Sequence, residues 1–474
     1  MNKLKLFLEN FLVYGFGSII SKAVPLLMVP IVTRLMPSSE YFGLSDLSGI
    51  VVSIGAAIAV NGMYDAMFRL FFEKDEVEYK QTVCSTAFIF TLFLSVIIFF
   101  LLLIFKDLIA ELFFNNAKYS FLVYICAIAV LVSSTNSIIC APTRMENKRK
   151  VFLVTNTLAP ILAYSVSIPM LLKGYYVTAL PVAGLVSSTI LEIAFGVMNK
   201  KWFSFRRFDV AILKQLLVIA IPIGPSFLVY WIFSSCDKVM ITNMIGLEAA
   251  GIYAVGSKIG TASQLIYMAF AGGWQYFAFS TMKEDNQVKS NSLVFEYLGV
   301  ISFVATACVC TISLTLFDVL FPKEYLSGFI VAPYLFMSPL ILMLYQIIGN
   351  QFLVVKITWP TMIVLSFGAV VNIALNFLLI PMFGIEGAAA STLLGYIAST
   401  LLAFIVLSKM KLVVISKQFV WAIIFMIIFA VGWRVVFLDK LLYGMIATLI
   451  FVMALAFTYK DVIVKLVGMI RNKA

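Results

Sequence analysis

The chain has 474 residues, of which 62% are hydrophobic and 12% are charged, and its formal net charge is +11. Soluble domains carry about 25% charged residues, so this apolar excess along the whole length indicates a membrane protein with many spans. The chain contains no histidine, which excludes His-based acid–base chemistry, Ser-His triads and His metal sites. It also contains no C-x-x-C pair, so the sequence indicates neither a zinc site nor a redox dithiol.

Fourteen stretches are apolar and long enough to cross a bilayer as helices. Their approximate limits are 11–35, 43–66, 82–105, 120–142, 151–172, 178–199, 212–244, 249–273, 291–317, 327–350, 360–381, 385–407, 419–438 and 441–459. The connections are too short for a soluble domain. The predicted fold class is therefore an all-α polytopic membrane protein with about 14 transmembrane helices.

The first span places Lys22 near its middle. An ammonium at that depth costs about 2.5–3.5 kcal/mol on insertion scales, so it persists where it faces a polar cavity or a partner. One interpretation is that Lys22 lines a hydrated cavity that attracts an anion. The alternative is a structural pair with Asp46 or Asp65 of the second span.

The second span begins with Asp46 and continues with a polar row at helical spacing. Ser53, Asn61 and Asp65 follow one another at multiples of four residues, and Arg69 lies one turn further on. Asp46 and Asn61 are candidate substrate-binding groups. Asp65 and Arg69 are candidates for coupling or gating, or form an ion pair at the helix end.

The seventh and eighth spans carry the next charged groups. Asp237 and Lys238 are adjacent, so on a helix their side chains point about 100° apart. Lys258 lies inside the eighth span, next to Ser257 and one turn from Thr261. Asp237, Lys238 and Lys258 are therefore further candidate substrate-binding residues, although Lys238 could instead reach the outer interface. No catalytic residue and no metal ligand is predicted.

Three pairs of short motifs recur in the same order about 200 residues apart. They are Glu40-x-x-Gly43 with Glu248-x-x-Gly251, Ile168-Pro169-Met170 with Ile380-Pro381-Met382, and Gly184-x-x-x-Ser188-Thr189 with Gly387-x-x-x-Ser391-Thr392. This repeat predicts an N-terminal six-helix bundle over 1–205, a second over 206–410, and two additional helices over 411–474. Repeats of this kind place the substrate site between the halves.

The basic residues are distributed unequally between the two sides of the membrane. About 24 lysines and arginines fall on one side and 7 on the other. The positive-inside rule then places both termini in the cytoplasm. The net positive charge therefore reflects topology, and no nucleic-acid partner is predicted.

With these features the chain resembles the polysaccharide-biosynthesis flippases of the O-antigen and capsule type (Wzx-like), within the multidrug/oligosaccharidyl-lipid/polysaccharide exporter superfamily. The residues that carry the resemblance are Pro30-x-x-Thr33-Arg34-Leu35, Tyr41-Phe42-Gly43-Leu44, Asp237-Lys238, Gly246-x-x-x-x-Gly251-Ile252-Tyr253, and the run from Asn376 to Ala389.

The resemblance implies two bundles in a V shape that alternate between inward and outward openings in the bacterial cytoplasmic membrane. It implies no enzymatic activity. The implied substrate is an undecaprenyl-pyrophosphate-linked oligosaccharide moved from the inner to the outer leaflet by a monomer, with glycosyltransferases and a polymerase as partners. The related lipid II flippases place basic residues on helices 1, 2 and 8. Lys22 and Lys258 match two of these, but helix 2 offers Asp46 and Asn61 instead.

Two other transport functions remain open, a drug/cation antiporter of the same superfamily and a lipid II flippase. A polymerase or ligase would need a large extracytoplasmic loop, and a scaffold would not need lysines within its spans. No Gly-x-x-x-x-Gly-Lys-Ser/Thr loop occurs, so no nucleotide cofactor is predicted. Coupling is expected to Na⁺, to H⁺ or to the membrane potential.

Overall fold

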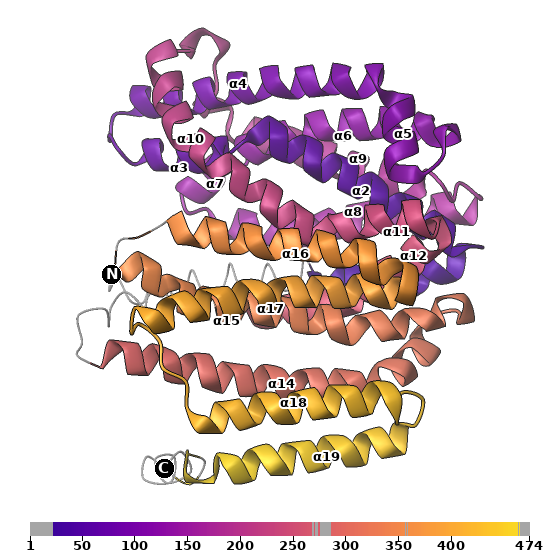
Figure 1. Cartoon of the computed structure of the whole chain (residues 1–474). Coiled ribbons are helices and arrows are strands. Elements are labelled where there is room, and N and C mark those ends of the chain that lie inside the picture. The colour runs from indigo at the N-terminus through magenta and orange to yellow at the C-terminus, as the bar shows by residue number, and fades with distance from the viewer. Residues whose placement is uncertain are drawn as a thin grey trace. The chain divides into compact units, whose positions relative to one another are not determined.

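The computed structural model describes residues 22–267, 286–355 and 359–462, together with the single residues 270, 274, 357 and 464. Within these ranges the chain forms helices joined by short connections, and no strand is present (Figure 1). Because hydrocarbon offers no hydrogen-bond partners, apolar segments of this length satisfy their backbone groups internally as helices. The predicted all-α fold class is confirmed.

Twelve helices of the described residues are long and apolar enough to cross a membrane. They coincide with twelve of the fourteen predicted spans. The remaining two, 11–35 and 249–273, extend into residues outside the described ranges. The total of fourteen therefore stays a prediction.

By packing, the chain divides into two compact units, Met1–Ala254 and Val255–Ala474. The division expected from the repeat, at 205/206 and 410/411, stays a prediction. After a helix over 22–35, the helices of the first unit are α2 (Ser39–Val60), α3 (Met63–Phe71), α4 (Val77–Ile104), α5 (Lys106–Phe114), α6 (Ser120–Ile139), α7 (Ala141–Met145), α8 (Arg149–Leu172), α9 (Ala179–Met198), α10 (Val210–Trp231), α11 (Asp237–Met244) and the start of α12 (Leu247–Gly260).

The first unit is built around α6, which packs against α2, α4, α5 and α9. Small and β-branched side chains such as Cys126, Ala127 and Val130 are buried along it. Gly55 of α2 lies so close that a Cβ atom there would come within 2.7 Å of a Val130 methyl. Close approach through small residues is the usual basis of helix association in membranes, where the hydrophobic effect gives little help.

The second predicted span is interrupted. α2 ends at Val60, and the chain turns through Asn61 and Gly62, both with positive φ (40° and 75°), before α3 begins. The break packs on α10, where a Cβ at Gly224 would lie 2.1 Å from the Asn61 Oδ1. The predicted continuous row from Ser53 to Asp65 is therefore wrong, because the left-handed residues end the helix between them.

The second unit contains α14 (Gln287–Leu320), α15 (Val331–Val354), α16 (Trp359–Phe383), α17 (Ile385–Lys409), α18 (Lys417–Val435) and α19 (Leu441–Thr458). α16 and α17 pack most extensively, and the Asn372 side chain on α16 donates to Thr392 Oγ1 on α17 at 3.2 Å. A Cβ on Gly368 would lie 2.4 Å from the Gly395 carbonyl oxygen, so the two backbones touch.

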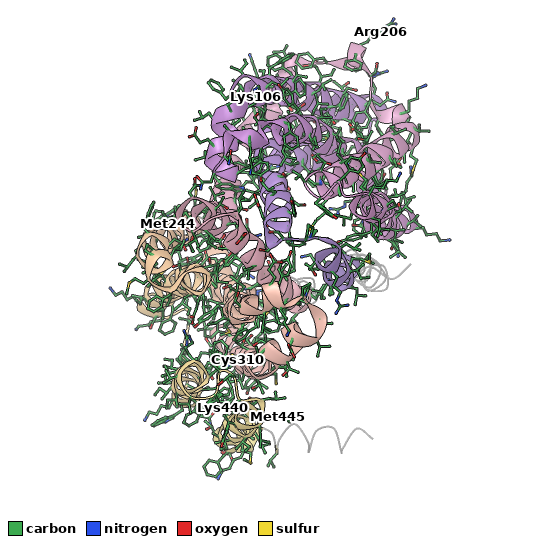
Figure 2. The ribbon with its side chains drawn as sticks, turned by 90° about the vertical axis from the view of Figure 1, so that its right-hand side faces the viewer. Lys106, Arg206, Met244, Cys310, Lys440 and Met445 are labelled. Carbon is green, nitrogen blue, oxygen red and sulfur yellow. The ribbon has the colours of Figure 1, made fainter. Side chains whose placement is uncertain are left out.

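The last two helices lie side by side and pack on α14 (Figure 1). Figure 2 looks along the helices and shows Met445 on α19, Lys440 in the connection before it, and Cys310 on the neighbouring α14. Thr311 of α14 bonds Thr448 of α19 at 2.6 Å, and Phe419 of α18 covers Gly299 of α14. The pair is therefore fixed to its unit through α14.

Candidate functional site

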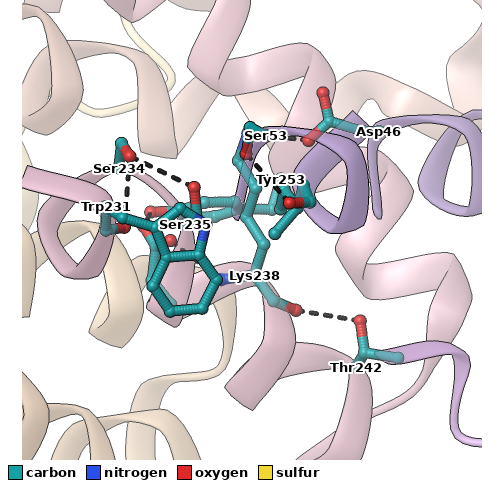
Figure 3. Close-up of polar contacts among 10 residues, drawn as sticks. Asp46, Ser53, Trp231, Ser234, Ser235, Lys238, Thr242 and Tyr253 are labelled. Atoms are coloured by element: carbon teal, nitrogen blue, oxygen red, sulfur yellow. Dashed lines mark hydrogen bonds and ion pairs between the residues drawn. The ribbon is translucent and has the colours of Figure 1, made fainter. Parts of the chain in front are cut away.

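A buried ion pair joins two membrane-spanning helices of the first unit. Lys238 Nζ on α11 lies 2.7 Å from Asp46 Oδ2 on α2 (Figure 3). The two side chains are only 13% and 11% exposed. A pair this well shielded costs considerable desolvation, which makes it weak evidence for stability and a candidate for function.

A second carboxylate adjoins this pair. Asp237 is 3% exposed, and its carboxylate accepts a hydrogen bond from the Tyr253 hydroxyl of α12 and another from the Lys238 backbone N–H at 2.8 Å. The adjacent Asp237 and Lys238 side chains thus diverge, as predicted for neighbours on a helix. We call Asp46, Asp237, Lys238 and Tyr253 the ionic cluster.

A π-helical turn, Ile232–Cys236, separates α10 from α11 immediately before the cluster. Ser234 there donates to the Trp231 carbonyl at 3.1 Å and lies 3.1 Å from the Ser235 hydroxyl (Figure 3). Such turns add a residue to a helix and occur frequently at functional sites. This one sets the directions in which Asp237 and Lys238 point.

A cavity of about 380 Å³ lies between α2, α6 and α9 of the same unit. Five serines contribute to its lining, namely Ser45, Ser48, Ser53, Ser133 and Ser188. Gly184 also lines it and has no atom within 4 Å of its would-be Cβ. We call this space the serine cavity. Its size is in the range of small-molecule sites, and hydroxyl groups can both donate to and accept from a polar ligand.

The described residues contain no cluster of histidine, cysteine, aspartate or glutamate that could hold a metal ion. The polar groups that this unit offers to a ligand are the charges of the ionic cluster and the hydroxyls of the serine cavity.

A comparison with protein families identifies the group to which the chain belongs. Residues 31–330 match the family described as polysaccharide biosynthesis protein. This chain is a member of that family. A relative in Methanocaldococcus jannaschii, an uncharacterised membrane protein, is 23% identical over 387 residues, which cover 77% of this chain and 89% of that protein.

Solved structures show which fold this family member adopts. The lipid II flippase MurJ in an inward closed conformation aligns with a TM-score of 0.73 at 16% identity, over 95% of this chain and all of that one. An inward-facing multidrug resistance MATE transporter of the MOP superfamily aligns at 0.60 and 15%, over 87% and 94%. At these identities the likeness shows the fold.

The other predicted site residues lie apart from the cluster. Asn61 caps α2 and packs on Gly224, so its contacts are those of a helix break. Asp65 and Arg69 both lie exposed on α3, and the predicted ion pair between them is not formed among the described residues. Their coupling role stays a prediction.

Lys22 and Lys258 belong to different units. Lys22, the first described residue of a helix that continues to residue 35, is exposed, and Lys258 is half-buried on α12. The carboxylate of Asp46, one of the alternative partners for Lys22, is paired with Lys238. The two-lysine cavity itself stays a prediction.

One contact of the ionic cluster was not predicted from the sequence. No pattern in the sequence marks Tyr253 as a partner of Asp237, because the two residues are 16 positions apart and meet only through a turn. In the second unit, Arg434 of α18 forms a bidentate ion pair with Glu386 of α17, with N–O distances of 2.6 and 2.9 Å. The arginine side chain is 44% exposed, so the pair lies partly in contact with its surroundings.

Proposed function

We propose that this protein is a flippase that moves an undecaprenyl-pyrophosphate-linked oligosaccharide from the inner to the outer leaflet of the bacterial cytoplasmic membrane. Membership of the polysaccharide biosynthesis family and the flippase-like fold support it. The observation that carries the proposal is the buried Lys238 ammonium inside the spanning helices of such a protein. No chemical step is part of the proposal.

The ionic cluster suggests how an anion is received. A pyrophosphate cannot enter hydrocarbon without counter-charges, and Lys238 supplies one where the low local dielectric strengthens the attraction. Lys238 is already paired with Asp46, so the substrate must displace that carboxylate. Displacement is favourable only when a proton or a sodium ion neutralises Asp46 at the same time, because an uncompensated buried charge is costly. Substrate binding and cation binding are thereby coupled.

The serine cavity suits the sugar part of the substrate. Its hydroxyls can bond saccharide hydroxyls without adding charge. The polyprenyl chain needs no polar site, because it remains in the lipid. Lys22 and Lys258 add positive charge as the two predicted bundles alternate between their openings, with both termini in the cytoplasm.

One observation favours a second candidate, a drug/cation antiporter. The ionic cluster holds two carboxylates, Asp46 and Asp237, against one ammonium, Lys238. A cluster with an excess of carboxylates attracts cations, as such an antiporter requires. The serine cavity and the family membership weigh toward the saccharide lipid.

Reconstituted vesicles distinguish these functions. Purified protein in proteoliposomes is supplied with a fluorescent polyprenyl-pyrophosphate oligosaccharide, with lipid II or with a cationic dye, under an imposed potential, proton or sodium gradient. We expect Lys238→Ala to lose translocation of the oligosaccharide lipid and Lys238→Arg to retain part of it. Lys106→Ala is the matched control and should leave translocation unchanged. It also removes a lysine that pairs with an aspartate, but this pair, Lys106 with Asp107, lies at the start of α5 and outside the ionic cluster. Transport of the dye alone would establish the antiporter, and transport of lipid II alone would reassign the substrate.

A further inference from the structure

A second, smaller cavity lies in the first unit, at the end where its basic loops gather. It has a volume of about 190 Å³ and is enclosed by α6, α7, α8 and α9. The same end carries the basic run from Lys148 to Lys150 and the residues Lys200 and Lys201. The cavity shares no lining residue with the serine cavity.

Arg144 provides the positive charge of this cavity. Its guanidinium lies 4.7 Å from the centre of the Phe152 ring, and its Nη1 donates to the Tyr64 hydroxyl at 3.4 Å. Among the described residues it has no carboxylate partner. The neighbouring Lys148 and Lys201 differ, because both pair with Glu146. Arg144 therefore keeps its charge-assisted donors for an external acceptor.

Two polar side chains beside Arg144 have hydrogen-bonding capacity left. The Thr143 Oγ1 accepts from the Asn199 side chain at 2.9 Å, so its hydroxyl proton remains available to donate. The Asn136 Oδ1 is buried and lacks a partner within the protein. A buried amide oxygen without a partner costs free energy that a hydroxyl donor of a bound molecule recovers.

A proline on α8 leaves a backbone carbonyl of one lining residue, Asn156, without its usual helical donor. Pro160 has no N–H, so it cannot donate to the carbonyl of Asn156 four residues earlier. The Asn156 side chain instead donates to the Phe152 carbonyl at 2.9 Å. The polar end of the cavity thus offers donors for an anion beside an acceptor for a hydroxyl.

The other end of the cavity is apolar. Ala159, Leu191 and Phe195 line it, and the last two belong to a small buried cluster with Ile139. A site with a cation at one end and hydrocarbon at the other matches an amphiphile. Its volume is below the roughly 300–1,000 Å³ of sites for drug-sized ligands, so it suits one phosphate with the first carbons of a chain.

We propose that this cavity binds a lipid-borne phosphate group, with the phosphate on Arg144 and Thr143 and the adjoining chain carbons on Leu191 and Phe195. The source is an anionic phospholipid or a polyprenyl phosphate, which share this chemistry. The site is separate from the ionic cluster and does not rest on the proposed transport function. Bound lipid fastens α7 and α8 to α6 and α9 at this end of the unit.

Native mass spectrometry of the purified full-length chain tests the proposal. The probes are dioctanoyl phosphatidylglycerol, farnesyl pyrophosphate, inorganic phosphate and uncharged dioctanoylglycerol. We expect at least one phosphorylated lipid to bind and dioctanoylglycerol to fail. Arg144→Gln should weaken that binding by about tenfold or more, since it removes hydrogen bonds to a charged group. The stronger of the two lipid probes identifies the source.

Two further variants make the outcome decisive. Lys150→Gln removes the same charge from an exposed position at the start of α8 and should leave binding unchanged. Asn156→Leu narrows the cavity, leaves every charge in place and should weaken binding. Equal losses in Arg144→Gln and Lys150→Gln would mean non-specific surface attraction and overturn the site. Inorganic phosphate binding as tightly as the lipids would overturn its lipid character. If Arg144→Gln does not fold, unchanged binding in Asn156→Leu overturns the proposal.

Discussion

The two copies of the Gly-x-x-x-Ser-Thr motif have opposite surroundings. In α9, Gly184 and Ser188 face the serine cavity, and a Cβ on Gly184 would meet no atom within 4 Å. In α17, a Cβ on Gly387 would lie 2.2 Å from the Leu379 carbonyl oxygen. The same motif therefore lines a cavity in the first unit and fixes a helix contact in the second. Recurrence of a short motif therefore does not imply the same packing at both positions.

Charged groups differ between the units in the same way. In the first unit Asp46 and Lys238 pair within spanning helices. In the second, Glu296 accepts from the Ser416 backbone N–H and hydroxyl, both at 2.6 Å, where α18 begins. Arg434, in the last turn of α18, pairs with Glu386. These second-unit contacts thus lie at helix ends, whereas Asp46 and Lys238 pair between two spanning helices.

The largest expected difference concerns these ion pairs. Asp46→Ala leaves the Lys238 ammonium buried without its partner and should lower the free energy of unfolding by about 3–5 kcal/mol. Arg434→Gln breaks a pair whose arginine is 44% exposed, so a loss of about 0–1 kcal/mol is expected. Thermal unfolding of the purified variants in one detergent measures both. Equal losses would remove the distinction between the units.

The glycines test the motif directly. Gly387→Ala forces the backbone of α17 away from Leu379 and should cost about 1–3 kcal/mol, as overpacking does. Gly184→Ala adds a methyl group to open space and should stay within about 0.5 kcal/mol of the parent. Melting temperatures in detergent give the comparison. A strongly destabilised Gly184→Ala would show that the cavity wall is packed after all.

A smaller effect is expected from the polar residues next to each motif. Asn372→Leu removes the bond to Thr392 between α16 and α17, and such bonds are worth about 0.6 kcal/mol on average in membranes. Ser133→Ala, in the wall of the serine cavity, should leave stability unchanged and weaken saccharide-lipid binding instead. Parallel unfolding and ligand-binding measurements separate the two. Reversed results would mean that the second unit holds the binding groups.

The smallest expected effect is on the stability of the folded state at acid pH. Burial alone would raise the pKa of Glu146, but its hydrogen bonds to Lys148 and Lys201 and their positive charges outweigh burial and hold it below its ordinary value of 4.5. A carboxyl with a lowered pKa stabilises the folded state at pH values above 4.5, and this contribution is lost as the pH falls below that value. Glu146→Gln should therefore flatten the acid side of the stability curve slightly. An unchanged curve in that variant would mean that the lysine contacts do not contribute to stability.

The spans were predictable because bilayer thickness dictates how many apolar residues a helix needs, and length and hydropathy can be read directly from the chain. The candidate site was predictable only in part. Asp46, Asp237 and Lys238 were recognisable as charges in apolar segments, whereas the pairing of Asp46 with Lys238 depends on packing between residues 192 apart. The break at Asn61–Gly62 was missed because both residues also occur within membrane helices, and only their positive φ angles reveal it.

The π-helical turn at Ile232–Cys236 has a consequence for how this chain tolerates insertions and deletions. Removing one residue from it, for example Ser234, would restore a regular α-helix without shortening any neighbouring element. The N–H groups beyond the turn would keep the same carbonyl partners, so the side chains that follow would keep their directions. Converting the turn to a regular α-helix without a deletion would instead rotate every later side chain by about 100°. Lys238 would then turn away from Asp46. The π-helical form of this turn therefore sets the rotation of the ionic cluster about the helix axis, whichever amino acids fill the turn.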